Sequence, residues 1–585
     1  MIRPSKDLLM PLVTAGSLLA ACLLAGCFES VPDPGDEQEP VTSWSQTLAS
    51  AELSYVLAQP ATPQTDRLEV KVPGERNFTS TGTVYSQPSV RKAAALSNMI
   101  LGMKSATEAY FGDLIAHCEQ QAADLVVECP DNLTDWYGET LTCEEFEQQQ
   151  REYERLVCLG NEQEGQPGPD IEAGAVEGHR VVNFIDAEAR ALDNDAGLLD
   201  ERALVEQLVL NMLAGGAPPP YRDWGMGDPR NGGYPSAEMD ASDGIGGELG
   251  ATPGGAQDIG FIRKVIDEGY VPFPFHMAVE GLLSEHDLPL QGAPCDQLLC
   301  IKTGVGVART LDHGTQSAFV QLGFSSGFTT ETFQRADLNL VVVLDKSGSM
   351  RDSGTENAAK MGAVKEGLQR MIDRLGPQDR LSVVLFNNEP RLLFDSVAVT
   401  DREALKAIVE GIEAGGGTNI EAGLRMGYQV AARHSEPGAR LDRVMLMTDA
   451  LPNVGRTGES SFLELVDHYA AQGMGLTVFG VGLNFGQELI LEICDRRGGN
   501  YFFLEDAAKI HKVFTEDFDF IVTPLAYDLH LDFTAADGFK VADVFGIRDW
   551  ENDPSGVSID VKTVFLSRNR GAIVLRLETD DIGPM

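Results

Sequence analysis

The sequence predicts a multidomain α/β protein: a doubly wound, mostly parallel sheet flanked by helices, a flanking β-rich region, and an N-terminal helical region stapled by disulfides. Three observations predict this fold class. Between residues 337 and 522, short apolar runs alternate with amphipathic segments, as strands and helices do in a parallel sheet. Beyond Pro524, apolar residues recur at every second position, which is typical of half-buried strands. Upstream, four cysteines cluster among Ala-rich and Glu/Gln-rich runs that favour helices.

Shifts in composition divide the chain into seven parts. They are a leader at 1–26, a flexible tether at 27–60, a helical cysteine-containing region at 61–175, a helix with a Gly/Pro-rich acidic loop at 176–256, a β-rich region at 257–335, the α/β domain at 337–522 and a second β-rich region at 523–585. We expect Ala187–Leu213 to form one helix. We also expect the two β-rich regions to join in one sandwich across the inserted α/β domain.

The first residues have the pattern of a secretory signal. Arg3 and Lys6 precede an apolar stretch whose length and flanking charge are typical of export. The stretch ends in Leu24-Ala25-Gly26-Cys27, which resembles the lipobox of bacterial lipoproteins. The resemblance implies cleavage before Cys27, a thioether-linked diacylglycerol on its sulfur and an acyl chain on the new amine. Several chains anchor a protein stably where one does not. The alternative is an ordinary signal peptide with a chance cysteine.

The compartment follows from the same segment. Phe28 follows Cys27, where an Asp would imply retention in the inner membrane, so the resemblance favours the outer membrane of the cell envelope. No other run reaches the ~18 apolar residues that a spanning helix needs. We therefore expect the mature chain to contact the membrane through its lipid anchor only.

The charge balance excludes one class of partner. The chain has 45 basic and 89 acidic residues, a formal net charge of −44. Nucleic acid binding needs a basic face, so we expect no nucleic acid partner. Direct binding to anionic lipid head groups is disfavoured for the same reason. An acidic surface favours solubility and divalent cations but identifies no function.

Six cysteines of the exported part are candidates for three disulfides, because an oxidising compartment favours them. They are Cys118, Cys129, Cys143, Cys158, Cys295 and Cys300. Six cysteines can pair in about 15 ways, and the simplest arrangement pairs the last two and leaves the first four to one another. A zinc site that uses His117 is the alternative, which the lack of a C-x-x-C pattern disfavours. Cys494 lies in a helix-like segment and is expected to be a buried free thiol.

The α/β domain begins with the apolar run Leu340–Leu344, which is rich in β-branched residues and reads as a strand buried on both faces. A helix with apolar residues at 3-4-3-4 spacing follows and stops at Gly376-Pro377. Leu381–Phe386 is the second strand, and Arg391–Asp395 is expected to return antiparallel at an edge. The predicted elements that complete the domain are a helix opened by the capping box at 400–403, a helix after Thr418, strands at 443–448, 476–481 and 500–504, and helices at 461–472, 486–497 and 507–521.

Oxygen-bearing side chains follow two of these strands. Asp345, Ser347 and Ser349 come directly after the first strand, and Asp449 comes directly after the strand at 443–448. Thr418 follows the glycine-rich run Gly415–Gly417 at the start of a helix. Ligands of open α/β sheets bind beyond the carboxyl ends of the strands, and carboxylate and hydroxyl oxygens suit a hard divalent cation.

The pattern D-x-S-x-S, a loop Thr and a strand-end Asp resembles the metal-ion-dependent adhesion site of von Willebrand factor type A (VWA) domains. The segment from Asp449 to Asn453 is also similar to that family's D-G-x-P-N, with Ala450 where glycine is usual. The resemblance covers roughly residues 337–522 and implies that all five oxygen-bearing residues hold a metal. As a whole, the chain resembles bacterial lipoproteins that carry a VWA domain.

Three hydroxyls and few carboxylates leave a cation under-neutralised, so it retains affinity for another anionic oxygen. In the resembling family that oxygen belongs to an Asp or Glu of a protein partner. Mg²⁺ suits a small oxygen set with retained waters, and Mn²⁺ or Ca²⁺ are alternatives. Each residue alone has a simpler interpretation as a cap or turn residue. Thr418-Asn419-Ile420-Glu421, for example, is itself a capping box.

We therefore predict a non-enzymatic receptor, a lipid-anchored envelope protein that adheres to, or scaffolds, an acidic protein partner. One alternative is a serine hydrolase, because Gly323-Phe324-Ser325-Ser326-Gly327 matches the nucleophile-elbow pattern G-x-S-x-G. That pattern needs a helix after Ser325, and Phe328–Gln334 is short for one. A second alternative is a structural lipoprotein whose metal only stabilises the fold.

Overall fold

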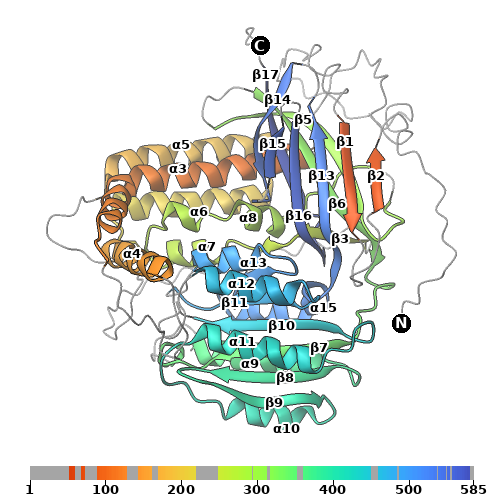
Figure 1. The fold of residues 1–585 in the computed structure, drawn as a ribbon. Coiled ribbons are helices and arrows are strands. Elements are labelled where there is room, and N and C mark those ends of the chain that lie inside the picture. Colours follow the sequence, from red (N-terminus) through yellow and green to blue (C-terminus); the bar gives the residue numbers. More distant parts are fainter. Residues whose placement is uncertain are drawn as a thin grey trace.

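The structure is a computed structural model, and it describes residues 52–58, 68–72, 88–127, 143–160, 169–218, 248–292, 294–311, 316–351, 360–449, 459–483, 487–535, 538–548, 550–553 and 556–579. The leader, Cys27, Cys129 and residues 450–453 lie outside these ranges. Figure 1 shows helices α3, α5 and α6 at the left, a large sheet at the upper right and a second sheet with its helices below.

The lower sheet has seven strands in the order β4-β12-β11-β10-β7-β8-β9. All its pairings are parallel except that of β9 with β8, which confirms the antiparallel edge strand. Its strands are β4 (Gly255–Ala256), β7 (Leu338–Asp345), β8 (Arg380–Phe386), β9 (Pro390–Ala398), β10 (Leu441–Thr448), β11 (Gly475–Gly480) and β12 (Asn500–Phe503).

Helices cover both faces of this sheet. The helices are α9 (Lys360–Arg374), α10 (Arg402–Glu410), α11 (Ile420–Arg433), α12 (Glu459–Ala470), α13 (Gln487–Cys494), α14 (Ala507–His511) and α15 (Phe518–Ile521). Successive side chains of a strand point to opposite faces. Leu340 and Val342 therefore pack in one core with α9, whereas Val341 and Val343 pack in the other with α11. This is why the run Leu340–Leu344 within β7 is apolar at every position, and it confirms a doubly wound α/β domain.

The upper sheet has ten strands and joins the two β-rich regions, but in one sheet and not in the predicted sandwich. The path is β14-β17-β6-β3-β16-β13-β1-β2, with β15 on β16 and β5 on β6. Its strands are β1 (Glu52–Ala58), β2 (Leu68–Val72), β3 (Glu248–Pro253), β5 (Cys300–Arg309), β6 (Gln316–Thr329), β13 (Pro524–Thr534), β14 (Phe539–Phe545), β15 (Trp550–Asp553), β16 (Gly556–Ser567) and β17 (Ala572–Thr579).

Two expectations for the first part of the chain need correction. Residues 52–58, placed in the tether, form β1 and pair with β13, and residues 68–72 of the expected helical region form β2. The amino-acid composition of a segment does not show whether it pairs with a distant strand. Residues 257–335 also contain more helix than predicted, namely α7 (Gly260–Asp267), the 3₁₀ turn Pro274–His276 and α8 (Val279–Glu285).

The N-terminal helices are α3 (Pro88–Ala123), α4 (Cys143–Gly160), α5 (Ile171–Ala191) and α6 (Ala196–Leu213). The prediction of one helix over 187–213 is wrong. Asp193 and Asn194 adopt left-handed backbone, with φ of 57° and 60°, and Asp195 caps α6 by accepting a hydrogen bond from Leu198 N at 3.1 Å. The chain therefore turns back here, and α5 and α6 pack as a hairpin beside α3 (Figure 1).

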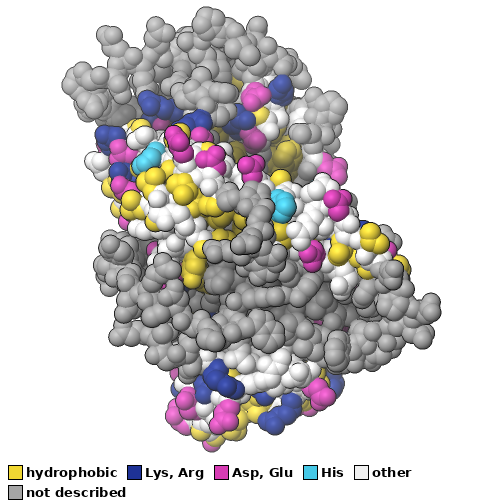
Figure 2. Space-filling model, turned by 90° about the vertical axis from the view of Figure 1, so that its left-hand side faces the viewer, with side chains coloured by type: hydrophobic (Ala, Val, Ile, Leu, Met, Phe, Trp, Pro, Cys, Tyr) yellow, Lys and Arg dark blue, Asp and Glu magenta, His cyan; other side chains and the backbone are white. Residues whose placement is uncertain are grey.

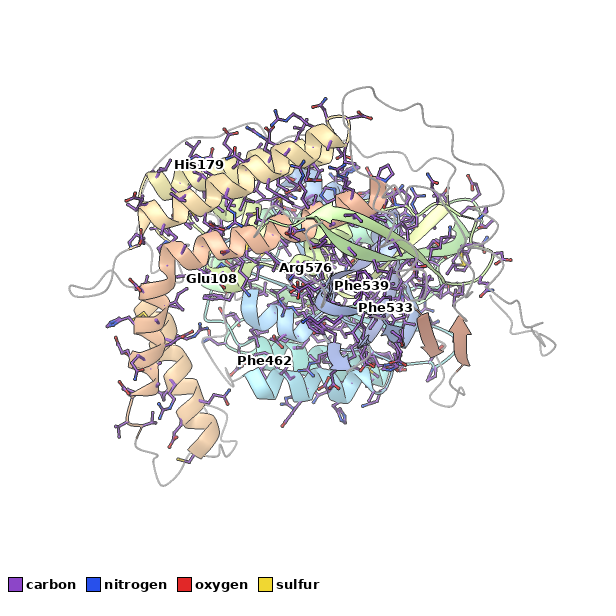
Figure 3. The ribbon with its side chains drawn as sticks, turned by 90° about the horizontal axis from the view of Figure 1, so that it is seen from above. Glu108, His179, Phe462, Phe533, Phe539 and Arg576 are labelled. Atoms are coloured by element: carbon purple, nitrogen blue, oxygen red, sulfur yellow. A yellow bond between two sulfur atoms is a disulfide. The ribbon has the colours of Figure 1, made fainter. Side chains whose placement is uncertain are left out.

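Seen from above, α3, with Glu108 labelled, and the α5–α6 hairpin, with His179, lie beside the strands that carry Phe533, Phe539 and Arg576 (Figure 3). Phe319 and Val574 of the large sheet share a buried core with α3, α5 and α6. The end view in Figure 2 shows hydrophobic side chains interspersed with charged ones on the outer surface. Within the described residues, no helix combines the length and apolar character needed to cross a membrane.

Two disulfides are described. Cys118–Cys158 joins α3 to α4 across a sequence separation of 40, and Cys295–Cys300 closes a short loop before β5. The second confirms the simplest predicted pair, and the first excludes both cysteines as zinc ligands. Cys143 is also disulfide-bonded. Cys494 is a buried free thiol, as predicted.

Buried ion pairs connect the helical region to the α/β domain. Lys509 Nζ of α14 lies 2.8 Å from Asp258 Oδ2, which precedes α7. Arg263 of α7 contacts Glu201 of α6 at 2.6 Å and Glu285 of α8 at 2.7 Å. Burial alone would lower the pKa of Lys509, but the neighbouring carboxylates raise it above its usual range. The two parts are therefore joined by paired charges as well as by apolar packing.

Candidate functional site

The candidate site lies where β7 and β10 end. These strands are neighbours in the sheet, with Leu344 opposite Met447, so their carboxyl ends meet at one edge. The chain leaves β7 through α9 to reach β8 on one side, and later returns to β10 on the other side. A crevice at the carboxyl ends of strands where the order reverses is the usual ligand position of this architecture.

Four of the five predicted oxygen-bearing residues form one hydrogen-bonded cluster. Asp345 Oδ1 accepts from Ser347 N at 2.8 Å. Ser347 Oγ and Ser349 Oγ are 2.9 Å apart, and Ser349 Oγ donates to Asp449 Oδ1 at 2.9 Å. The sequence order alone places Asp449 100 residues from Ser349. The parallel pairing of β7 with β10 brings them together.

Thr418 belongs to a loop that is fastened to this cluster through its backbone. Gly348 N donates to Gly416 O at 2.8 Å, and Gly415 N donates to Lys346 O at 2.7 Å. Thr418 is buried two residues beyond Gly416. Asn419 is the N-cap of α11 and accepts from Ala422 N at 3.1 Å, so the interpretation of Thr418 as the helix cap is wrong.

Two asparagines that the motif does not include hold the glycine-rich loop. Asn387 Nδ2 donates to Gly415 O at 2.7 Å, and Asn388 Oδ1 accepts from Gly417 N at 2.9 Å. Both follow β8, the strand next to β7, and Asn419 N donates to Asn387 O at 2.9 Å. Their position directly after a buried strand is the signal that could have identified them.

The carboxylates of the site are buried, and the turn that carries its second serine is exposed. Asp345 and Asp449 have no exposed surface, whereas Ser349 is exposed. Thr448 Oγ1, also missed in the sequence, donates to Asp345 Oδ2 at 2.7 Å. Burial and then the negative charge of Asp449 raise the pKa of Asp345 to about 7. Two carboxylates therefore meet in a place that disfavours the charge of Asp345, an arrangement that is common at functional sites.

A positively charged side chain of the protein also contacts the cluster. Lys360, the first residue of α9, places Nζ 2.7 Å from Asp449 Oδ2. Lys360 lies 89 residues before Asp449 in the sequence and belongs to no motif, so the sequence did not indicate this contact.

The residues present fit a hard divalent cation. The possible ligands are carboxylate and hydroxyl oxygens. A positive ion would offset the cost of burying the ionised carboxylate of Asp345, which raises the pKa of that residue. Asp449 keeps one oxygen on Ser349 and the other on Lys360, so both of its oxygens face the cluster.

The serine-hydrolase alternative does not agree with the structure. Ser325 lies inside β6, which continues to Thr329, so no helix follows it. Its Oγ donates to Cys300 O at 3.5 Å, within the pairing of β5 with β6. A nucleophile elbow needs a sharp turn between strand and helix, so this interpretation of Ser325 is wrong.

Comparison with known proteins assigns the α/β domain to a family. Residues 339–516 match the model of the von Willebrand factor type A domain. A protein named YfbK from Escherichia coli (strain K12) is 27% identical over 192 residues, which is 33% of this chain and 32% of that protein. Inter-alpha-trypsin inhibitor heavy chain H4 from Homo sapiens is 26% identical over 234 residues, 38% of this chain and 24% of that one. The chain thus spans less than half the length of these curated relatives.

Among solved structures, a von Willebrand factor type A protein from Catenulispora acidiphila is 17% identical and has a TM-score of 0.34, covering 50% of this chain and 68% of that one. The family match covers under a third of the chain and lies within the predicted 337–522. Residues 339–516 are a von Willebrand factor type A domain, set between the strands of a larger sheet.

Proposed function

We propose that this protein is a lipid-anchored receptor of the cell envelope that binds an acidic group of a protein partner through a divalent metal ion. The observation that carries the proposal is the convergence of two buried carboxylates with hydroxyl side chains at the ends of β7 and β10. Domains of this type generally bind protein partners and commonly hold a divalent metal. Adhesion and the scaffolding of an envelope complex are both compatible with it.

Asp345, Ser347, Ser349, Thr418 and Asp449 would hold the ion, with Mg²⁺ preferred and Mn²⁺ or Ca²⁺ as alternatives. When bound, the ion supplies a Lewis acid that accepts one more anionic oxygen. The protein's own residues set the geometry: Thr448 and Ser347 N fix Asp345, and Ser349 fixes Asp449. The asparagines after β8 fix the loop that carries Thr418.

A positively charged residue beside the serine-bearing turn also favours an acidic partner. Arg351 is exposed just after the turn that carries Ser349, and its Nη2 donates to Ala414 O at 3.4 Å, beside the glycine-rich loop. An exposed guanidinium can pair with a carboxylate in a bidentate manner. A partner's Asp or Glu would therefore meet positive charge before it reached the metal.

The lipid anchor of the proposal rests on the leader sequence ending at Cys27. Its test is Cys27→Ala, which should move the protein from the membrane pellet to the soluble fraction and remove fatty-acid labelling. A pelleted, unlabelled wild type would contradict lipidation, and recovery in the inner-membrane fraction would contradict the outer-membrane assignment.

Partner binding is tested by capture from envelope extracts with the wild type, Asp345→Ala and Asp395→Ala. Asp395 is an exposed aspartate on β9 that pairs with His434 and serves as the matched control. Capture should fail for Asp345→Ala and in EDTA, return with Mg²⁺, and persist for Asp395→Ala. Capture that survives Asp345→Ala while the melting temperature falls would favour the structural-lipoprotein alternative.

A further inference from the structure

The ammonium of Lys360 is built into the site rather than resting on its surface. It lies 2.7 Å from Asp449 Oδ2, and its side chain is 27% exposed while that of Asp449 is fully buried. A Cβ atom at Gly482 would lie 2.6 Å from Cε of Lys360, so the lysine stem passes over a glycine just after β11. The path of the side chain thus depends on a residue without a side chain at this position.

The formal charges of the cluster make this contact important. Of the described side chains that contact the two buried carboxylates, Lys360 is the one that carries a charge. With both carboxylates ionised and no metal, the cluster has one positive and two negative charges. A divalent ion would leave one positive charge in excess, and the carboxylate of a partner would then bring the sum to zero.

We propose that Lys360 makes this site a coincidence receptor: its ammonium weakens metal binding by the free protein and so couples the metal to an incoming carboxylate. This inference rests on the proposed function. The physical reason is that an ammonium and a divalent ion on the same carboxylate repel each other, and an added anion offsets that repulsion. In the free protein, Lys360 instead provides the counter-charge of Asp449.

The test is a calorimetric titration of the purified full-length protein with Mn²⁺ and with Mg²⁺. Each titration is run once in acetate and once in acetamide, which is the neutral analogue of acetate. In the wild type, acetate should strengthen Mn²⁺ binding at least three-fold relative to acetamide. Lys360→Met should bind Mn²⁺ more tightly by about ten-fold in acetamide, and acetate should then have little effect. Lys360→Arg keeps the charge and should stay near the wild type.

The matched control is Lys365→Met on the same helix, whose Nζ donates to Glu410 O away from the site, and it should leave Mn²⁺ affinity unchanged. Equal Mn²⁺ affinity in the wild type and Lys360→Met, or weaker binding in the variant, would overturn the role of Lys360 while the metal site stands. The wild-type comparison of acetate with acetamide needs no variant, so it decides the coupling even if Lys360→Met does not fold. No binding of either ion by any of the proteins would instead overturn the proposed function.

Discussion

Replacement of Gly416 by Ala tests whether the glycine-rich loop shapes the site. Gly416 has a φ of +99°, in the left-handed region that L side chains rarely adopt. A Cβ atom there would lie 2.6 Å from Asn387 Nδ2 and 2.7 Å from Asn388 Oδ1. These asparagines hold the neighbouring residues Gly415 and Gly417, so the loop cannot move without losing the hydrogen bonds that fix it.

The expected cost has two parts. Left-handed backbone costs a non-glycine residue about 1–2 kcal/mol. The close contacts add about 1–3 kcal/mol, the usual range for overpacking in a tight site. Gly438→Ala separates the two, because Gly438 has a φ of +81° and no atom within 4 Å of its added Cβ. Gly438→Ala should therefore lose only the first part, and Gly416→Ala about 2–5 kcal/mol in total.

The assay combines denaturant unfolding with Mn²⁺ calorimetry on both variants. Gly416→Ala should also weaken Mn²⁺ binding about ten-fold, a loss of ~1.4 kcal/mol, because Gly416 O accepts from Gly348 N of the serine-bearing turn. Gly438→Ala should bind Mn²⁺ like the wild type. Equal losses of stability and unchanged Mn²⁺ binding in both variants would show that the loop does not position the site.

Two further predictions concern stability. Burial raises the pKa of Glu505 from its usual 4.5 to about 7, with Asp258 and Glu285 adding to the shift and Lys509 and Arg263 opposing it. A carboxyl whose pKa is raised in the folded state contributes stability below pH 4.5 that is lost as the pH rises through 7. Glu505→Gln should therefore be more stable than the wild type at pH 8 by on the order of 2 kcal/mol, and equal to it near pH 4. Denaturant unfolding at the two pH values measures the difference. A pH-independent difference would contradict this assignment. Removal of the Cys118–Cys158 disulfide by the double change Cys118→Ala and Cys158→Ala should destabilise the packing of α4 on α3 by up to about 4 kcal/mol, the loop-entropy value for a separation of 40. Hydrogen exchange should then be faster in α4 than in α11. Unchanged exchange in α4 would show that apolar packing alone fixes it.

Much of the α/β domain could be predicted because its signals are local. The unbroken apolar run of β7 requires burial on both faces, and the two cores that receive its alternating side chains confirm this. The 3-4-3-4 spacing of α9 likewise depends only on neighbouring residues, whereas the N-cap of α10 is Asp401 and not Thr400 of the predicted capping box. The N-terminal part was harder, since β1 pairs with β13, which lies far along the chain, and β2 joins the sheet only by pairing with β1.

The sequence by itself determined which side chains follow the strands of the α/β domain, and hence that Asp345, Ser347, Ser349 and Asp449 would share one edge of the sheet. Only the tertiary structure decided what surrounds them. Lys360 reaches Asp449, and Asn387 and Asn388 hold the glycine-rich loop, because β8 and α9 pack beside β7. The periodicity of apolar residues indicates whether a residue is buried. It does not indicate which distant residue it contacts, because that depends on the order of the strands in the sheet.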